Sequence, residues 1–255
     1  MKYWGKADPV TNHPAGASIS VTLQGLSTAA RVSFEDGLRS DRVDGLPAAP
    51  ARRVVEFLAS FRARFGIDRP ARAAVASNFP VAAGLASSAS TFAALAKAAV
   101  SAAGLDVTNA ELASVARLGS GSACRSVFGG FVEWLPAETG SAVAPLAPEN
   151  HWPLAIVVAV TSESPKAVGS REGMTRTAAT SPYYRAWLDS GAVDFAAARG
   201  AILARDLSSL GPVVERNCLR MHAAAMAADP PLLYWEPATV AVMRRVSDLR
   251  AGGLE

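Results

Sequence analysis

The chain is short of cysteine and histidine. It has two cysteines, Cys124 and Cys218, and three histidines, His13, His151 and His222. The two cysteines lie far apart and the histidines are scattered, so the spacing of a zinc site is missing. We therefore expect no metal centre built from these residues, and the composition fits a reducing, cytoplasmic location.

Long apolar runs and blocks of like charge are also missing. No run approaches the roughly 18 to 20 apolar residues of a membrane span, and the charged, aromatic start does not resemble a signal peptide. The net charge is only +3, and the basic residues are spread along the chain. This distribution argues against nucleic acid or a membrane surface as a partner. Hydrophobic residues make up 50% of the 255 positions, which is enough for one large or two smaller domains.

The first half of the chain mixes strand and helix patterns. Period-two alternation predicts a strand over 18–23, which we expect to pair with a second strand over 29–34. Apolar residues at helical spacing predict a helix over 51–65. Its arginines are expected to face water: Arg52, Arg53, Arg62 and Arg64. Further elements are predicted as a strand over 71–77, a helix over 88–103, a helix capped by Thr108 and Glu111, and a strand over 130–134.

The second half is predicted to be mainly helical. An irregular, proline-rich stretch over 144–153 marks a domain boundary, which gives domains 1–150 and 151–255. The apolar run over 154–161 predicts a buried strand. Ser181 and Pro182 are expected to begin a helix. Three more helices are predicted near 194–207, 212–228 and 237–251.

The stretch from Pro80 to Ser90 combines small residues, a glycine and hydroxyl side chains before an alanine-rich helix. A turn through Gly84 followed by a helix that starts at Ser87 or Ser88 would direct backbone amides toward an anion. This pattern predicts a phosphate cradle. An ordinary loop with a serine N-cap is the alternative.

A second concentrated stretch, 117–126, alternates glycine with serine and ends in Cys124 and Arg125. The glycines expose backbone amides, and the Arg125 guanidinium can hold a carboxylate or phosphate through two hydrogen bonds. A flexible linker between a helix and a strand is the alternative.

These stretches together resemble the diphosphomevalonate decarboxylase family. The resemblance runs along nearly the whole chain, and it rests on the segments 2–6, 18–23, 78–89 and 119–126. The family belongs to the GHMP kinase superfamily, which includes galactokinase, homoserine kinase and mevalonate kinase. The resemblance implies an α+β, two-domain GHMP-kinase-like fold, with a ribosomal S5-like N-terminal domain and an α/β C-terminal domain.

The resemblance also implies an activity. A family member uses ATP and Mg²⁺ to phosphorylate the 3-hydroxyl of mevalonate 5-diphosphate, after which phosphate and carbon dioxide leave and isopentenyl diphosphate forms. A cytoplasmic homodimer with this small-molecule substrate is expected. A related phosphomevalonate decarboxylase, a mevalonate 3-kinase and a non-catalytic paralogue stay open as alternatives.

The family pattern assigns roles to residues of this chain. Catalysis is assigned to Arg125, which would clamp the substrate carboxylate, to Lys2 near the reacting hydroxyl, and to Ser88, which would also lie near the metal. The ATP phosphates are assigned to Gly84, Leu85, Ala86, Ser87 and Ser88. The rest of the substrate is assigned to Tyr3, Lys6, Ser120, Gly121, Ser122, Ser170, Arg171 and Met174. For some of these residues simpler roles are open: Tyr3 as a core aromatic, Lys2 and Lys6 as solvated charges, and Ser170 and Arg171 as surface residues at a helix entry.

The sequence departs from the family pattern in three places. The family begins with a strand containing an Ala-x-Asn-Ile-Ala-like segment, and it carries an Asp-Ala-Gly-Pro-Asn segment whose aspartate is the catalytic base. Neither segment occurs here, and we nominate no substitute base. We expect a fragment truncated at both ends, with little turnover of its own; a variant that lacks the base is the alternative. Gly16 and Ala17 replace polar side chains, which leaves monophosphate and diphosphate substrates open.

Overall fold

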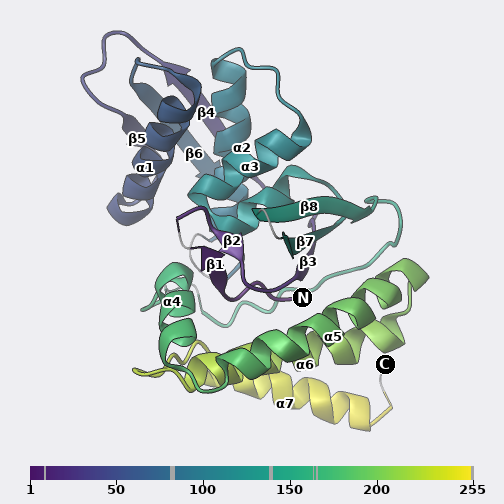
Figure 1. Cartoon of the computed structure of the whole chain (residues 1–255). Coiled ribbons are helices and arrows are strands. Elements are labelled where there is room, and N and C mark those ends of the chain that lie inside the picture. The colour runs from purple at the N-terminus through teal and green to yellow at the C-terminus, as the bar shows by residue number, and fades with distance from the viewer. Residues whose placement is uncertain (9, 81–83, 138–139, 163, 165, 254–255) are drawn as a thin grey trace.

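The computed structural model describes residues 1–8, 10–80, 84–137, 140–162, 164 and 166–253 (Figure 1). The strands are β1 (Lys6–Asp8), β2 (His13–Pro14), β3 (Ser18–Val21), β4 (Thr28–Phe34), β5 (Arg42–Asp44), β6 (Ala71–Ser77), β7 (Phe131–Ala137) and β8 (Gly140–Ala147). The helices are α1 (Ala48–Phe65), α2 (Ser87–Ala102), α3 (Asn109–Gly119), the 3₁₀ helix η1 (Gly121–Val127), α4 (Ser170–Thr180), α5 (Tyr184–Ala204), α6 (Leu207–Met226) and α7 (Pro237–Ala251).

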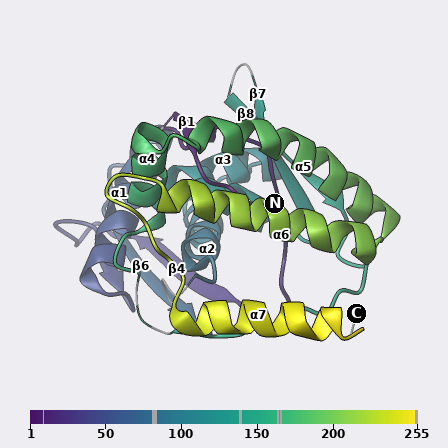
Figure 2. The same cartoon turned by 90° about the horizontal axis from the view of Figure 1, so that it is seen from below.

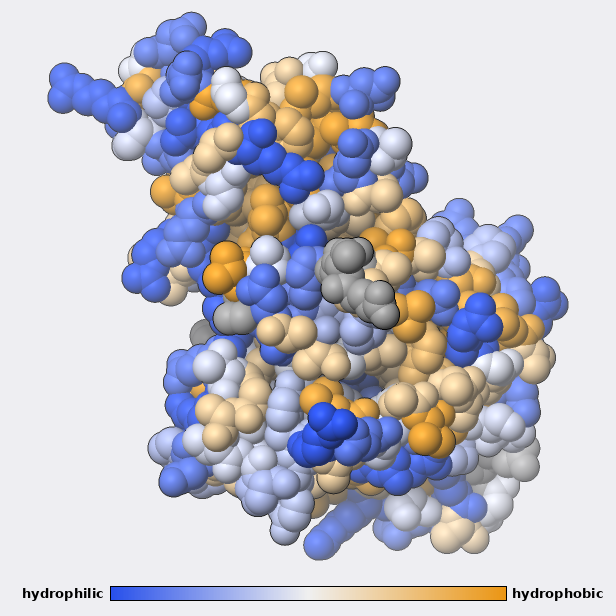
Figure 3. Space-filling model, viewed as in Figure 1, coloured by the Kyte–Doolittle hydropathy of each residue, from blue (hydrophilic) through white to orange (hydrophobic). Residues whose placement is uncertain are grey.

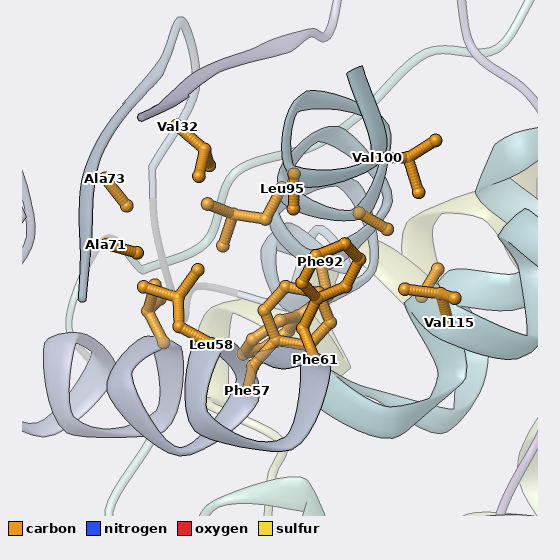
Figure 4. Close-up of a cluster of buried hydrophobic side chains, with 14 of the residues drawn as sticks. Val32, Phe57, Leu58, Phe61, Ala71, Ala73, Phe92, Leu95, Val100 and Val115 are labelled. Carbon is orange, nitrogen blue, oxygen red and sulfur yellow. The ribbon is translucent and has the colours of Figure 1, made fainter. Parts of the chain in front are cut away.

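The first core lies between a three-stranded sheet and two helices. In the sheet order β4-β6-β5, β4 runs antiparallel to β6 and β5 runs parallel to it. Alternate residues of β6 are buried, and because Ala71 and Ala73 are small, helices can approach the sheet closely. Phe57 and Phe61 of α1 meet Phe92 of α2 in this core (Figure 4). The helical spacing expected over 51–65 is confirmed.

A second sheet joins the two halves of the chain. Its order is β3-β7-β8, and both pairings are antiparallel. Ile19 and Phe131 of this sheet pack with Ile202 of α5 and Val213 of α6 in one buried cluster. The chain's first residues and the β1–β2 hairpin lie between the part that carries α1, α2 and α3 and the helices α4–α7 (Figure 1). The N-terminal segment is therefore placed at the junction of the two parts.

Two expectations about strands are wrong. The strands over 18–23 and 29–34 do not pair, because β3 pairs with β7 and β4 pairs with β6 in a different sheet. The stretch 154–161 is not a strand, and Val157 is 94% exposed. No strand among the described residues lies beside this stretch to satisfy its backbone hydrogen bonds, and a lone strand is not stable in water.

The helices of the second half also differ from expectation. Ser181 ends α4 and does not begin the next helix, and one helix, α5, replaces the two predicted over this region. Helix α6 starts five residues before Pro212, because the Asp206 side chain accepts a hydrogen bond from the Ser209 amide (3.1 Å) and caps the helix. Among the described residues after 150 the regular elements are helices.

Candidate active site

The N-terminal segment Lys2–Lys6 is held from both sides. The Tyr3 ring lies against Trp134 of β7, with ring centroids 4.8 Å apart. The next residue points the other way: Trp4 is buried with Met174 and Trp187 of the helical part. Its indole Nε1 donates to Thr177 Oγ1 (3.1 Å), and its carbonyl accepts from Trp187 Nε1 (3.0 Å). Tyr3 and Trp4 are thus packed aromatics, and this packing fixes where the two flanking lysines emerge.

Arg125 is a buried cation that has no carboxylate partner among the described residues. It lies on η1, is 8% exposed, and stacks 5.6 Å from the Trp134 ring. Nη1 donates to Ser18 Oγ, while Nε has no hydrogen-bond partner among the described residues. Burial lowers the pKa of the Arg125 guanidinium. A charge held in this way is costly unless an anion meets it, so the site suits a ligand carboxylate.

Three further cations gather at the end of the segment: its own Lys6, together with Arg53 and Arg171. The Lys6 ammonium donates to Asn12 Oδ1 (2.6 Å), and burial together with the charges of Arg171 and Arg53 lowers its pKa to about 8. Burial, followed by the charge of Arg171, also lowers the pKa of Arg53. None of the three forms an ion pair within the described part of the chain. Their mutual repulsion would be relieved by a phosphate group.

Arg53 was expected to face water, and that expectation is wrong. Its Nη2 donates to the Gly119 carbonyl (2.9 Å), and its guanidinium lies 5.2 Å from the Phe92 ring centroid. The available signal was position: Arg53 comes one helical turn before Phe57, on the edge of the apolar face of α1.

The two stretches of small residues, 80–90 and 117–126, meet next to Arg53. Ser88 Oγ lies 3.3 Å from Ser120 Oγ, and a side chain at Gly121 would come within 2.5 Å of Tyr3 Oη. The chain turns through Gly84 at φ +93 before α2 starts at Ser87, as expected, and no side chain of the described residues caps this end of the helix. Residues 81–83 of the loop lie outside the described residues. The helix start with Ser88 fits an ATP phosphate chain.

A magnesium ion fits the same place through its phosphate ligands. No group of three or more His, Cys, Asp or Glu within the described ranges can hold a metal ion. Mg²⁺ usually keeps several waters and binds substrate phosphates with one or two protein oxygens. Ser88 can supply such an oxygen.

Lys2 lies near a second cation, Lys166, and near His222, and sequence reasoning missed both neighbours. Burial and the charge of Lys2 lower the pKa of Lys166, whose Nζ lies 5.3 Å from the Tyr234 ring centroid. Burial, Lys2 and Lys166 lower the pKa of His222 to about 4, so this histidine is neutral at pH 7. Lys166 stands four residues before Ser170, and this proximity to a predicted site was the signal available.

The remaining predicted residues occupy different settings. Ser170 and Arg171 are exposed at the first turn of α4, and Arg171 acts electrostatically on Tyr3 and Lys6. Met174 is buried against Trp4 and also borders an open pocket next to Lys6. Figure 3 shows an indentation between the part that carries α1 and the part that carries α4. Ser122 lies on η1 between Gly121 and Arg125.

The fold and the site define a class of protein. A mixed α/β part, in which α2 starts at Ser87 beside the cations of the site, joined to a helical part, is a two-domain GHMP-kinase-like arrangement. Residues 1–144 match the model of the diphosphomevalonate decarboxylase-like N-terminal domain, and residues 156–252 match that of the mevalonate 5-diphosphate decarboxylase C-terminal domain. The chain belongs to the diphosphomevalonate decarboxylase family.

Individual relatives agree with this assignment. The diphosphomevalonate decarboxylase of Aspergillus fumigatus is 34% identical over 274 residues, which cover 98% of this chain and 68% of the relative. Mevalonate diphosphate decarboxylase from Staphylococcus aureus superposes with a TM-score of 0.89 at 36% identity, covering 100% of this chain and 79% of that one. A structure described as MDDEF in complex with MVAPP, AMPPCP and magnesium gives a TM-score of 0.88 at 35% identity, with coverage of 100% and 80%.

Proposed function

We propose that the protein catalyses the ATP-dependent decarboxylation of mevalonate 5-diphosphate to isopentenyl diphosphate, with ADP, phosphate and carbon dioxide as the other products. One observation carries the proposal: the buried Arg125, which meets no carboxylate among the described residues, acts on Tyr3 together with Arg171, and Arg171 in turn acts on Lys6 and Arg53. The pattern matches a ligand with a carboxylate at one end and a phosphate ester at the other. The family membership supports the same substrate.

The proposed roles follow from these charges. Arg125 binds the carboxylate and orients the bond to be broken, while Lys6, Arg53 and Arg171 hold the 5-diphosphate. Ser88 and the start of α2 hold the ATP phosphates, and bound Mg²⁺ neutralises charge on the phosphoryl group in transfer. Lys2, which has Lys166 as a neighbouring cation, is given the role of stabilising the charge that develops in the transfer.

The reaction balances in two steps. The 3-hydroxyl oxygen takes the γ-phosphoryl group of ATP and its proton is released to water, which gives ADP. The carbon–oxygen bond to the new phosphate then breaks, and the electron pair of the carbon–carboxylate bond forms the double bond as carbon dioxide leaves. Residues of this chain bind and orient the substrate, and none of them is assigned as the acceptor of the hydroxyl proton.

Product analysis tests the proposal. With MgATP and mevalonate 5-diphosphate, whatever turnover the protein has should give equal amounts of ADP, phosphate and carbon dioxide. ADP without carbon dioxide would instead favour the alternative, a mevalonate 3-kinase. Calorimetric binding of mevalonate 5-diphosphate and of AMPPCP gives a second measure that does not need turnover. Three cations around one site favour mevalonate 5-diphosphate over mevalonate 5-phosphate as the ligand. Comparing the Kd values of these two ligands decides between a diphosphate and a monophosphate decarboxylase.

We further infer a homodimer in a reducing compartment. Both cysteines, Cys124 and Cys218, are unpaired thiols, which supports the compartment. The dimer rests on the family resemblance and is tested by sedimentation velocity. Within the described residues no helix is long and apolar enough to cross a membrane.

A further inference from the structure

A buried carboxylate of α5 is held by side chains of α6, and this network contacts the N-terminal segment at Lys2. Asp194 of α5 is 1% exposed, and its carboxylate accepts from Arg216 Nε (2.9 Å), Arg216 Nη2 (2.7 Å) and Arg220 Nη1 (3.1 Å). Its Oδ2 also accepts from Asn217 Nδ2 (3.4 Å). The carboxylate is therefore fully engaged by donors from α6.

Asn217 connects Asp194 to the N-terminal segment. It is 1% exposed, and its Oδ1 accepts from the backbone amide of Lys2 (2.9 Å). An ionised carboxylate can only accept hydrogen bonds, so Asp194 requires the NH₂ group of Asn217 to face it. The amide oxygen must then face Lys2. Asp194 thus determines the orientation of the group that holds Lys2.

A second hydrogen bond to the helical part lies two residues further along the N-terminal segment. The Trp4 carbonyl accepts from Trp187 Nε1 of α5 (3.0 Å). In an extended chain, residues two apart direct their backbone groups to the same side. The amide of Lys2 and the carbonyl of Trp4 are accordingly both held by side chains of the helical part, while Tyr3 between them points to Trp134.

We propose that Asp194 and Asn217 are positioning residues, which set the placement of Lys2 and Tyr3 for substrate by fixing the Lys2 backbone. The inference rests on the proposed function, in which Lys2 acts where charge develops on the phosphoryl group; Tyr3 stands beside it as the residue that the family pattern assigns to the substrate. Neither Asp194 nor Asn217 touches the substrate in this scheme. The network also reaches the site from α5 and α6, so it couples the placement of the segment to the helical part.

The chain offers a direct readout of this hydrogen bond. It contains four lysines, Lys2, Lys6, Lys97 and Lys166, so protein labelled with ¹⁵N-lysine gives four backbone amide signals that lysine-to-arginine substitutions assign. The Lys2 amide should exchange slowly in the wild-type protein. In the Asn217→Leu variant the Lys2 signal should shift and exchange at least tenfold faster, while the Lys97 signal stays unchanged.

Ligand affinities supply the functional readout. In Asn217→Leu the Kd for mevalonate 5-diphosphate should rise about tenfold or more, because small misplacements of binding groups are costly. The Kd for AMPPCP should change less than twofold. The matched control is Val213→Ala, which removes buried volume from the same helix. It should lower the Tm and leave the Lys2 signal and both affinities unchanged.

A second variant keeps the test decisive if Asn217→Leu does not fold. Asp194→Asn keeps the side-chain volume, and Arg216 and Arg220 are 42% and 43% exposed, so water can solvate them. In this variant the side-chain amide of Asn217 is free to rotate by half a turn. The backbone amide of Lys2 should therefore exchange faster than in the wild-type protein, as in Asn217→Leu. Unchanged Lys2 exchange in both variants would overturn the inference, whatever the protein binds.

Two further outcomes separate the inference from the function. Faster Lys2 exchange with an unchanged Kd for mevalonate 5-diphosphate would overturn the positioning role and leave the proposed function standing. Wild-type protein that does not bind mevalonate 5-diphosphate would overturn the proposed function, and the inference resting on it, even with a protected Lys2 amide.

Discussion

The buried positive charges of the site, on Arg125 and Lys6, lower the stability of the folded state. Arg125 is buried with a hydroxyl partner and, in the part of the chain that the structure describes, no carboxylate, and Lys6 is partly buried beside Arg53 and Arg171. Such groups favour a ligand of opposite charge and lower stability in its absence. Removing one should therefore affect binding and stability in opposite directions.

The Arg125→Met variant is expected to lose function without losing stability. Without the guanidinium the substrate carboxylate has no partner, so activity should fall at least a hundredfold. The free energy of unfolding should stay constant or rise by up to about 2 kcal/mol, because an unpaired buried charge is replaced by an apolar chain. Steady-state kinetics and urea denaturation measure the two effects.

The exposed Arg31 of β4 provides the matched control. Arg31→Met removes the same charge and should leave both quantities unchanged. A clear loss of stability in Arg125→Met, with activity retained, would contradict the role given to Arg125.

Substrate affinity should depend on pH through Lys6. Its pKa is about 8, lowered by burial and by Arg171 and Arg53, so the ammonium is charged below pH 8 and loses its proton above it. The Kd for mevalonate 5-diphosphate should rise about tenfold between pH 7 and pH 9.5 as this charge is lost. The phosphate charge is constant in this range, because its second pKa is about 6. Calorimetric titrations at several pH values measure the trend.

Lys6→Arg is the matched variant, because arginine stays protonated across this range. The variant should bind with a flat pH profile, whatever its absolute affinity. Lys97→Arg, which changes an exposed lysine on α2, should keep the wild-type profile. The same slope in Lys6→Arg as in the wild-type protein would show that another group titrates.

At the scale of elements, α3 illustrates a local signal with a measurable energy. Thr108 Oγ1 accepts from the Glu111 amide (3.2 Å), and Glu111 Oε2 accepts from the Thr108 amide (2.8 Å), which confirms the predicted capping box. Thr108→Ala should lower the free energy of unfolding by about 1 kcal/mol, measured by urea denaturation. Substrate affinity should not change, because the cap lies at the far end of α3 from Ser120.

The mid-helix hydroxyl of Ser60 serves for comparison. Ser60 Oγ donates to the Glu56 carbonyl within α1 (2.9 Å), and alanine is the better helix former. Ser60→Ala should leave stability unchanged or raise it slightly. Equal losses in both variants would contradict a specific capping contribution.

Local signals of this kind explain what the sequence predicted correctly. The cap at Thr108, the apolar spacing of α1 and the helix start at Ser87 each depend on residues within a few positions. The wrong expectations concern non-local partners: the pairing of β3 with β7, the missing neighbour for 154–161, and the Gly119 carbonyl that receives Arg53. Neither periodicity nor composition specifies such partners.

The same distinction applies to the candidate site. The family motif indicated Arg125, Lys6 and Ser88 because those residues stand in recognisable segments. Lys166 and His222 come from outside the quoted motifs, and only packing places them near Lys2. The hydrogen bond from Lys2 to Asn217 spans 215 positions, so no pattern within the sequence points to it.

At the scale of the whole molecule, one region exposes apolar side chains. Val157 is 94% exposed, and no residue of α7 is buried among those described. Thr161 Oγ1 and Thr239 Oγ1, 2.9 Å apart, join the stretch 154–161 to α7 (Figure 2). We call this region the apolar edge, and its exposed members are Ile156, Val157, Val158, Val160, Val240, Val242, Met243 and Val246. Surfaces of this kind promote association.

The apolar edge should bind the dye 1-anilino-8-naphthalenesulfonate and cause association at high protein concentration. Val157→Lys should lower the dye fluorescence and shift association to higher concentration, since it places a solvated charge within the edge. Stability should change by less than about 0.5 kcal/mol, because the side chain makes few contacts to lose. Val10→Lys is the control: Val10 is 83% exposed and stands far from the edge in the sequence, and its backbone amide donates to Asp8. If both substitutions lower dye binding equally, net charge is responsible and the apolar edge is not the dye site.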